Sequence, residues 1–433
     1  MIVAAEAIPN DLPACKLYPK SLAVIGGLTS HSVNVVSYAC DGTQVERTVQ
    51  DQLVSGAART ISYRVPDPEG KDHTITLPIF ADSPVVMIQD SKHALKTMRN
   101  NLFSGARALV LGNHLTMYSY AWDLTFSEIP NHPLYHRDVQ KMDRQDDNAA
   151  TRLFSAETLN FIQKHYSDRV GFVVYLFVMG EVVDTYQSRT ISHSERVRMA
   201  LRCRYFLRLW RRFLKARKYP ETKYYISREA KDILEKLIDD LLALIYMYRD
   251  KFEGRYPLLL WLHSTEICKH VFAECRKLIK DFTHLNFLFM TLRLYTLLHA
   301  LLALSCGTDP KARANGYSHS YLDPETARIE SLAVFPSDEE IEALMGQAWE
   351  EAVTLLSLVG IESDDINNPA LGSQGLVILP PPPMPARSLT MNVTGRTVTK
   401  TSLMLLNSRA LLRFKGLRTG GQSMDPCRRR CMS

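Results

Sequence analysis

Two aspartates follow β-rich runs of the chain, and this placement could hold a divalent cation. Asp41 comes shortly after residues 33–39 (VNVVSYA), and Asp90 comes directly after residues 85–89 (VVMIQ). Ligands of open α/β sheets bind beyond the carboxyl ends of the strands, and Mg²⁺ prefers carboxylate oxygens together with water or phosphate. The pattern predicts that Asp41 and Asp90 bind a metal ion. The alternative is structural: Asp41 would be a turn residue, and Asp90 would cap the helix that follows it.

A second group of polar residues matches part of a kinase active site but lacks its partners. His136, Arg137 and Asp138 match the start of a kinase catalytic loop, whereas the position of the metal-binding asparagine is Asp143. The sequence also contains no glycine-rich phosphate loop, no Walker A lysine, no G-x-S-x-G turn and no H-E-x-x-H helix. Kinase chemistry is therefore rejected, and no other common catalytic motif replaces it.

A predicted helix over residues 196–218 combines an apolar face with a basic face. Apolar residues from Cys203 to Leu214 recur at spacings of three and four, and the segment contains ten basic residues and no acidic one. Clustered guanidinium groups contact phosphate backbones whatever the base sequence, so this face predicts DNA binding. The alternative is a solvated face whose long side chains lie over apolar surface. The candidate nucleic-acid-binding residues are Arg204, Arg208, Arg211, Arg212 and Lys215.

The elements that must position these residues fall into two classes. The first hundred residues alternate between β-rich and helical stretches, which is typical of an α/β sheet. Most of the chain from there to residue 367 has helical periodicity, with Gly254 and Pro257 marking one break. We expect strands at residues 2–5, 33–39 and 85–89, and helices at 44–53, 92–103, 196–218, 228–249, 264–304 and 337–358.

The net charge of the whole chain does not predict what it binds. The formal charge is +6, and the composition, with 46% hydrophobic and 23% charged residues, is typical of globular domains. Residues 381–433 contain ten basic residues and one acidic residue, a charge of +9, which leaves −3 for the residues before them. Beyond residue 367 helical periodicity ends and a run of prolines follows, so we expect residues 368–433 to be disordered.

Targeting and membrane signals are weak. Residues 1–10 lack the basic and apolar regions of a secretory signal, which favours a nuclear or cytoplasmic location. The most apolar long stretch, residues 285–306, is interrupted by Arg293 and His299, so we expect a buried helix and no membrane contact. The eight cysteines show neither a disulfide framework nor a zinc spacing. These patterns leave self-association and protein partners open.

Several blocks of sequence occur in an order that resembles a known family. The blocks are Cys40 to Gly42, Gln89 to Asn100, Tyr135 to Asp147, Tyr175 to Glu181 and Ser264 to Phe272. Together they resemble the transposase core of the P-element and THAP-associated family, and the likeness is closest to the transposon-derived proteins of fungal genomes. The resemblance covers roughly residues 1–323 of the chain.

The resemblance implies an RNase H-like domain interrupted by a helical insertion. It also implies an Asp, Asp, Glu triad that binds two Mg²⁺ ions for DNA strand cleavage and joining. Asp41 matches the second carboxylate of the triad. Asp90 begins the block D-x-x-H-x-x-K-x-x-R-N, which is not part of the triad. The residues that match the family signature are His93, Lys96, Arg99, Asn100, Lys269 and Phe272.

Two positions of the implied triad lack a carboxylate. The first aspartate should end a strand well before Asp41, and residues 1–40 contain no such position, so we expect the first two strands and any zinc module before them to be absent. The third carboxylate should stand three residues before Phe272, where the residue is Lys269. A lysine has only hydrogen-bond donors and cannot bind Mg²⁺. Glu266, one helical turn earlier on nearly the same face, could replace it.

We therefore predict a fold of the α/β plus all-α class: an incomplete RNase H-like sheet with a large helical insertion and a disordered C-terminal tail. The predicted function is that of a catalytically inactive transposase-derived protein that binds DNA through the basic helix. The alternatives are an active Mg²⁺-dependent strand transferase using Asp41, Glu266 and a carboxylate supplied elsewhere, a helical protein-interaction scaffold, and a decaying reading frame without a selected role. The expected domains are a partial core at residues 1–116, the insertion at 117–256, closing helices at 257–305, a helical extension at 306–367 and the tail at 368–433.

Overall fold

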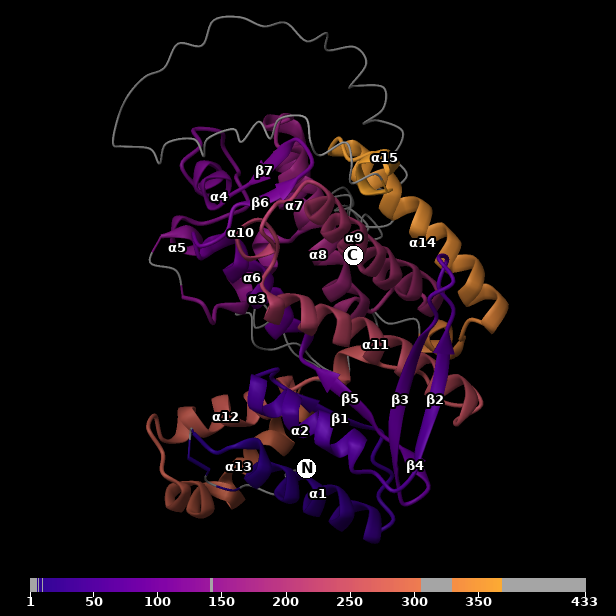
Figure 1. Ribbon diagram of the computed structural model, residues 1–433. Helices are drawn as coiled ribbons and strands as arrows, with labels where there is room; N and C mark the ends of the chain where they lie inside the picture. The colour runs from indigo at the N-terminus through magenta and orange to yellow at the C-terminus, as the bar shows by residue number, and fades with distance from the viewer. Residues whose placement is uncertain (1–5, 7, 10, 141–142, 305–328, 368–433) are drawn as a thin grey trace, which may run out of the picture. The chain divides into compact units, whose positions relative to one another are not determined.

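Two parallel strands flanked by helices form the first part of the structure (Figure 1). The computed structural model describes residues 6, 8–9, 11–140, 143–304 and 329–367. Its first elements include α1 (Ala14–Ser30), β1 (Ser37–Cys40), α2 (Gln44–Ser55), β5 (Val86–Gln89) and α3 (Ser91–Phe103). β1 pairs in parallel with β5, and Cys40 lies opposite Gln89, so the two strands end at the same edge. The two strands and two helices predicted between residues 33 and 103 are confirmed, with shifted boundaries.

β1 begins later than predicted because the backbone before it closes α1. The Val33 N–H donates to the Leu28 carbonyl oxygen at 3.0 Å, and Ser32 has a positive φ of 60°. A residue in the left-handed conformation, together with a hydrogen bond between residues five positions apart, is a common way to end a helix. Residues 31–33 therefore terminate α1, a helix that the sequence analysis did not predict.

α2 is fixed against the strand pair by its cap and its apolar face. The Thr43 hydroxyl accepts a hydrogen bond from the Glu46 N–H, and the Glu46 carboxylate accepts one from the Thr43 N–H. Val49 and Leu53 pack in one buried cluster with Met87 of β5 and with α1. Each such apolar side chain contributes roughly 1.5–3 kcal/mol by leaving water. This packing holds β5 beside β1.

A β-hairpin that the sequence analysis did not identify lies between α2 and β5. Its strands, β2 (Thr60–Val65) and β3 (His73–Phe80), pair antiparallel, and β3 also pairs with β4 (Ser83–Pro84). A loop at residues 66–72 joins β2 to β3, and Gly70 within it has a positive φ of 71°. The signal that could have revealed the hairpin is the pair of β-branched runs around a turn containing Pro and Gly.

From Tyr118 to Asp250 the regular elements among the described residues are all helices joined by loops, as predicted. A short antiparallel pair, β6 (Leu109–Leu111) and β7 (His114–Thr116), precedes them. The helices are α4 (Tyr118–Thr125), α5 (His136–Val139), α6 (Asp147–Leu153), α7 (Ala156–His165), α8 (Val170–Gln187), α9 (His193–Ala216), α10 (Glu221–Tyr224) and α11 (Arg228–Asp250). α8 packs against α9, and α11 contacts α9, α3 and β5. α11 therefore joins these helices to the strand pair.

α8 is an apolar core helix with one buried charge pair. By length and composition α8 could cross a membrane, but 83% of it is buried inside the protein, as in the core helices of soluble proteins. Its Glu181 is 2% exposed and accepts hydrogen bonds from the guanidinium of Arg202 on α9. Because a buried carboxylate needs such a partner, Arg202 faces the core and does not belong to the basic outer face.

The last described elements follow α11. They are η1 (Leu260–Leu262), α12 (Glu266–Leu278), α13 (His284–Leu304), η3 (Ile329–Ala333), α14 (Asp338–Leu358) and α15 (Ser363–Asn367). The predicted helix at 264–304 is therefore two helices, and the predicted helix at 337–358 is confirmed as α14. α14 lies along α9 (Figure 1).

The expectation of a buried helix at residues 285–306 is wrong for the described part of α13. Met290 and Leu294 of α13 pack against α12. On another face Phe289 is 80% exposed and Leu292 is 83% exposed. The helix is apolar on more than one face, and α12 covers one of them, which is why a long apolar run did not lead to full burial.

The described strands form small sheets within a largely helical structure. These sheets are β1 with β5, β2 with β3 and β4, and β6 with β7. All described residues belong to one compact unit, and the predicted domain boundaries and RNase H-like sheet stay predictions. The expectations for residues 2–5, 306–328 and 368–433 concern residues outside the described part of the chain.

Candidate functional site

The two candidate metal-binding aspartates lie at the edge where β1 and β5 end. The Asp90 N–H donates to the Cys40 carbonyl oxygen at 3.0 Å, which places Asp41 next to Asp90. Asp90 also caps α3, because its Oδ1 accepts hydrogen bonds from the backbone N–H groups of Lys92 at 2.8 Å and His93 at 3.3 Å. The capping alternative for Asp90 is confirmed. Its other oxygen, Oδ2, contacts α12.

The ammonium group of Lys269, on α12, lies among three carboxylates. Its Nζ is 2.8 Å from Asp90 Oδ2, 3.0 Å from Asp41 Oδ1 and 3.4 Å from Glu266 Oε1. The other oxygen of Glu266 accepts a hydrogen bond from Lys92 Nζ at 2.7 Å. We call these four residues, Asp41, Asp90, Glu266 and Lys269, the lysine–carboxylate cluster. The three acidic residues converge as an active site would require, but a lysine stands at their centre.

The charges of the cluster stabilise one another. His93, whose Nδ1 is 3.5 Å from Asp41 Oδ2, and then Lys269 hold the pKa of Asp41 well below its usual range. Burial opposes ionisation of Asp90, but Lys269 and the Thr265 hydroxyl still hold its pKa below the ordinary value. Burial also opposes the charge of Lys269, and its carboxylate partners nonetheless raise its pKa. At neutral pH the ammonium and both aspartates are therefore charged.

The cluster does not fit a Mg²⁺ ion. Mg²⁺ binds oxygen ligands at 2.0–2.1 Å in near-ideal octahedral geometry. The Lys269 ammonium contacts the oxygens that would supply those ligands, and its positive charge repels a cation. Among the described residues, no group of three or more His, Cys, Asp or Glu side chains is arranged to hold a metal ion.

Most signature residues of α3 hold a neighbouring segment rather than the cluster. Lys96 Nζ is 3.0 Å from Asp147 Oδ1 at the start of α6. Arg99 and Asn100 donate hydrogen bonds to backbone carbonyls of the segment just before α6. Phe272, on α12, is 48% exposed. In this part of the structure, the block that begins at Asp90 fixes the position of α6 against α3.

All five candidate nucleic-acid-binding side chains are on α9, and each one pairs with a carboxylate. Arg204 pairs with Asp239, Arg208 with Asp67 and Glu69, Arg212 with Glu69, and Arg211 and Lys215 with Glu221. The exposure of the side chains ranges from 11% for Arg204 to 60% for Lys215. Much of the positive charge of this helix is therefore balanced within the protein.

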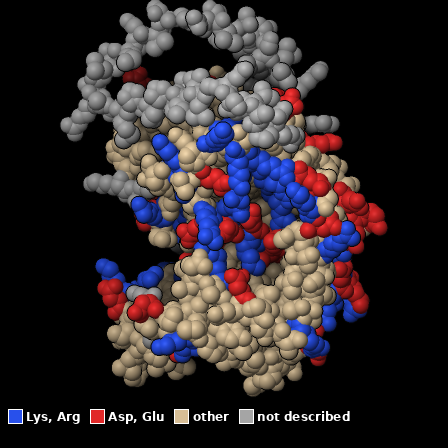
Figure 2. All heavy atoms as spheres, in the orientation of Figure 1, with Lys and Arg blue, Asp and Glu red and all other residues tan. Residues whose placement is uncertain are grey.

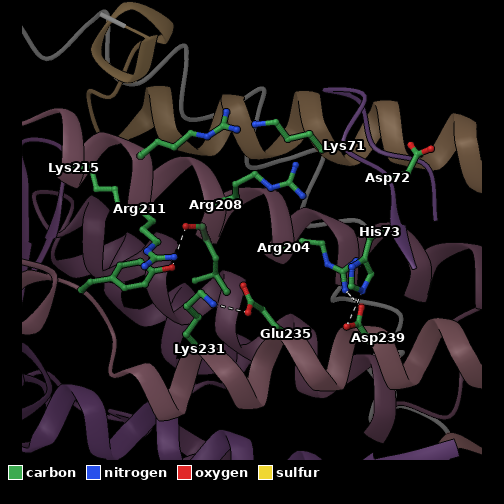
Figure 3. A pocket seen from close by; sticks show the side chains of 13 residues that line it. Lys71, Asp72, His73, Arg204, Arg208, Arg211, Lys215, Lys231, Glu235 and Asp239 are labelled. Atoms are coloured by element: carbon green, nitrogen blue, oxygen red, sulfur yellow. Dashed lines mark hydrogen bonds and ion pairs between the residues drawn. The ribbon is translucent and has the colours of Figure 1, made fainter. Parts of the chain in front are cut away.

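The same side chains line a cavity of about 450 Å³ (Figure 3). Its walls come from α9, α11 and the end of the β2–β3 hairpin, and include seven basic side chains, among them Lys71 and Lys231. The acidic side chains of the wall are Asp72, Glu235 and Asp239. Figure 2 shows basic and acidic atoms interleaved on one face of the molecule. The basic excess of the wall makes the cavity suitable for an anionic group.

The acidic partners of α9 on the 66–72 loop were missed because they are distant from the helix in the sequence. Asp67 precedes Arg208 by 141 residues, and Glu69 precedes Arg212 by 143 residues. The acidic loop at residues 66–72 was visible in the sequence, but no local pattern links it to α9. The pairing depends on how the β2–β3 hairpin packs against the helices.

Comparison with known proteins yields one structural likeness. No protein-family model matches the chain, and no curated protein matches it. The chain is similar to a solved structure described as the Drosophila P element transposase strand transfer complex, with 14% sequence identity and a TM-score of 0.48. The likeness covers 66% of this chain and 64% of that chain, so this chain matches slightly less than two thirds of its neighbour.

Proposed function

We propose that the chain is a transposase-like protein that does not cut or join DNA and that acts by binding. The observation that carries this proposal is the lysine–carboxylate cluster. Lys269 Nζ lies within 3.4 Å of all three carboxylates that could have held catalytic metal ions. The sequence blocks from Cys40 to Phe272 support the transposase-like assignment.

Two-metal strand cleavage needs cations that Lys269 cannot replace. Two metal ions about 4 Å apart stabilise the attacking and the leaving oxygen of the reaction. An ammonium supplies one charge, and it does not activate water as a metal ion does. A metal ion could bind the three carboxylates only if the Lys269 ammonium lost its proton or left the cluster. The raised pKa of Lys269 opposes loss of the proton.

We expect the wild-type protein to show no metal-dependent nicking of DNA. Supercoiled plasmid and labelled oligonucleotide duplexes would be incubated with the protein and Mg²⁺ or Mn²⁺, and the products separated on gels. Wild type and Asp41→Ala should both show only the amount of nicking seen with buffer alone, because Asp41 already pairs with Lys269 and does not hold a metal ion. Mg²⁺-dependent nicking that Asp41→Ala abolishes would show instead that the protein is an active enzyme.

A specific observation favours nucleic acid as the binding partner. The cavity beside α9 has seven basic side chains, and the side chains of Arg211 and Lys215 are 40% and 60% exposed. Their partner Glu221 is shared between them. Exposed ion pairs of this kind contribute only about 0–1 kcal/mol, so an incoming phosphate can replace the carboxylate at little cost.

Replacing Arg211 and Lys215 together with glutamine should weaken DNA binding by roughly tenfold near 0.1 M salt. Loss of two phosphate contacts should also reduce the slope of log affinity against log salt by about 1.8. Fluorescence anisotropy of a labelled duplex over a range of salt concentrations measures both quantities. The matched control is Arg59→Gln with Arg255→Gln, which removes two exposed arginine charges away from this cavity. An unchanged salt slope in the Arg211 and Lys215 variant would exclude this face as the binding surface.

A further inference from the structure

The loop at residues 66–72 places two carboxylates on the basic face of α9. Asp67 Oδ2 accepts a hydrogen bond from Arg208 at 2.6 Å. The two carboxylate oxygens of Glu69 accept hydrogen bonds from the two terminal nitrogens of Arg212, one of them at 2.6 Å. This fork-to-fork pairing is also the geometry in which arginine binds a phosphate group. The loop thus occupies two guanidinium groups that a nucleic-acid backbone would use.

The backbone of the loop prearranges this contact. The Glu69 N–H donates to Asp67 Oδ1 at 3.0 Å, and the Gly70 N–H donates to the Asp67 carbonyl oxygen at 2.8 Å. Gly70 has a positive φ of 71°, which glycine adopts without steric cost. The turn therefore presents Asp67 and Glu69 together toward α9.

The two contacts differ in exposure. The Asp67 side chain is 4% exposed, whereas the Glu69 and Arg212 side chains are 24% and 31% exposed. The hydrogen bond from Arg212 lowers the pKa of Glu69, so this carboxylate is ionised at neutral pH. Because the Glu69 pair remains in contact with water, it contributes little to stability and can open first. The more buried contact between Asp67 and Arg208 must then also break for the loop to leave α9.

The size of the cavity indicates that the loop must move for a polymer to bind. A volume of about 450 Å³ is typical of pockets for small molecules. Lys71 and Asp72, at the end of the same loop, form part of its wall. A continuous nucleic-acid strand needs a longer open surface, which α9 would offer once the loop has left Arg208 and Arg212.

We propose that the 66–72 loop is an internal competitor for the phosphate backbone of nucleic acid on α9, and that nucleic acid binds there by displacing it. This inference rests on the proposed nucleic-acid-binding function. It adds a second determinant of affinity, because the carboxylates of Asp67 and Glu69 both block two arginines and repel incoming phosphates. Removing their charge frees the arginines without altering any basic side chain.

The test is the Asp67→Asn and Glu69→Gln double variant in the full chain. Its affinity for a labelled DNA duplex should rise about tenfold because no charged loop has to be displaced, while its salt slope should stay close to that of the wild type, because the same arginines contact phosphates in both complexes. The matched control is Asp82→Asn with Glu253→Gln, which removes one aspartate and one glutamate charge that pair with Arg59 and Arg255 elsewhere. The control should bind DNA as the wild type does.

A second measurement uses the wild-type protein alone. Hydrogen exchange of residues 66–72 should accelerate when DNA is added, because the loop leaves α9. Equal affinities of the wild type and the double variant, or slower exchange of the loop with DNA, would overturn the competitor proposal while leaving DNA binding intact. Failure of both proteins to bind DNA would refute the proposed function itself. Tight binding of inorganic tripolyphosphate with no binding of DNA would assign the face to a small anion instead.

Discussion

Replacing Lys269 with alanine should destabilise the protein by about 3 kcal/mol and make its stability depend on divalent cations. Removing one partner of a buried charge pair costs roughly 3–5 kcal/mol, and the lower end applies because the Lys269 side chain is 32% exposed. Without the ammonium, Asp41 and Asp90 would lie beside Glu266 with no Lys269 charge to balance them. A divalent cation supplied from solution could then take its place, since Ca²⁺ and Mg²⁺ prefer carboxylate oxygens.

Urea unfolding of the wild type and of Lys269→Ala, with and without Mg²⁺, Mn²⁺ or Ca²⁺, measures this effect. A cation that binds only the folded variant at a hundred times its dissociation constant adds about 2.7 kcal/mol to its stability. The wild type should not respond to these ions. Lys92→Ala is the matched control, because it removes an ammonium from Glu266 but leaves Lys269 in place. If the alanine variant were as stable as the wild type and unaffected by cations, Lys269 would not be the balancing charge of the cluster.

Replacing Arg202 with methionine should lower the free energy of unfolding by about 3–5 kcal/mol. The Arg202 side chain is 0% exposed and pairs with Glu181 of α8 and with Glu351 of α14. The substitution keeps most of the volume but removes the guanidinium, so Glu181 would stay buried without its strongest partner. Because α8, α9 and α14 meet at this residue, the loss should reduce the stability of the whole helical part.

Denaturant unfolding of a small set of variants separates charge from packing. Adding Glu181→Leu to Arg202→Met should recover much of the lost stability, because well-packed apolar residues often replace a buried ion pair without loss. Arg255→Met serves as the surface control and should change stability by less than about 0.5 kcal/mol. A cost below about 1 kcal/mol for Arg202→Met alone would mean that the pair is balanced by other groups.

Much of the local structure around the candidate site was predictable. The β-rich runs that end before Asp41 and Asp90 are strands, and the stretch after Asp90 is a helix that this residue caps. Strand alternation, capping and helical period depend on neighbours within a few residues, so the sequence shows them directly. The β2–β3 hairpin was not predicted, although the pair of β-branched runs around its turn is also a local pattern.

The role of Lys269 could be predicted only in part. Its position where a carboxylate was expected already argued against metal binding. That its ammonium contacts Asp41, Asp90 and Glu266 at once follows from the packing of α12 beside the β1–β5 edge, across more than 170 residues of sequence. Helical period places Glu266 near Lys269, but no helical or strand period brings Asp41 and Asp90 to it.

The basic residues of α9 show most clearly which properties follow from the sequence and which depend on the tertiary structure. The sequence alone established that a helix would form there, with apolar residues on one face and ten basic residues between positions 196 and 218, eight of which lie within α9. Which of those charges are buried, which are balanced and which remain open to an anion was settled by folding. Arg202 meets Glu181 in the core, and Arg212 meets Glu69 on a distant hairpin, because an ion pair depends on distance in space and not on separation along the chain.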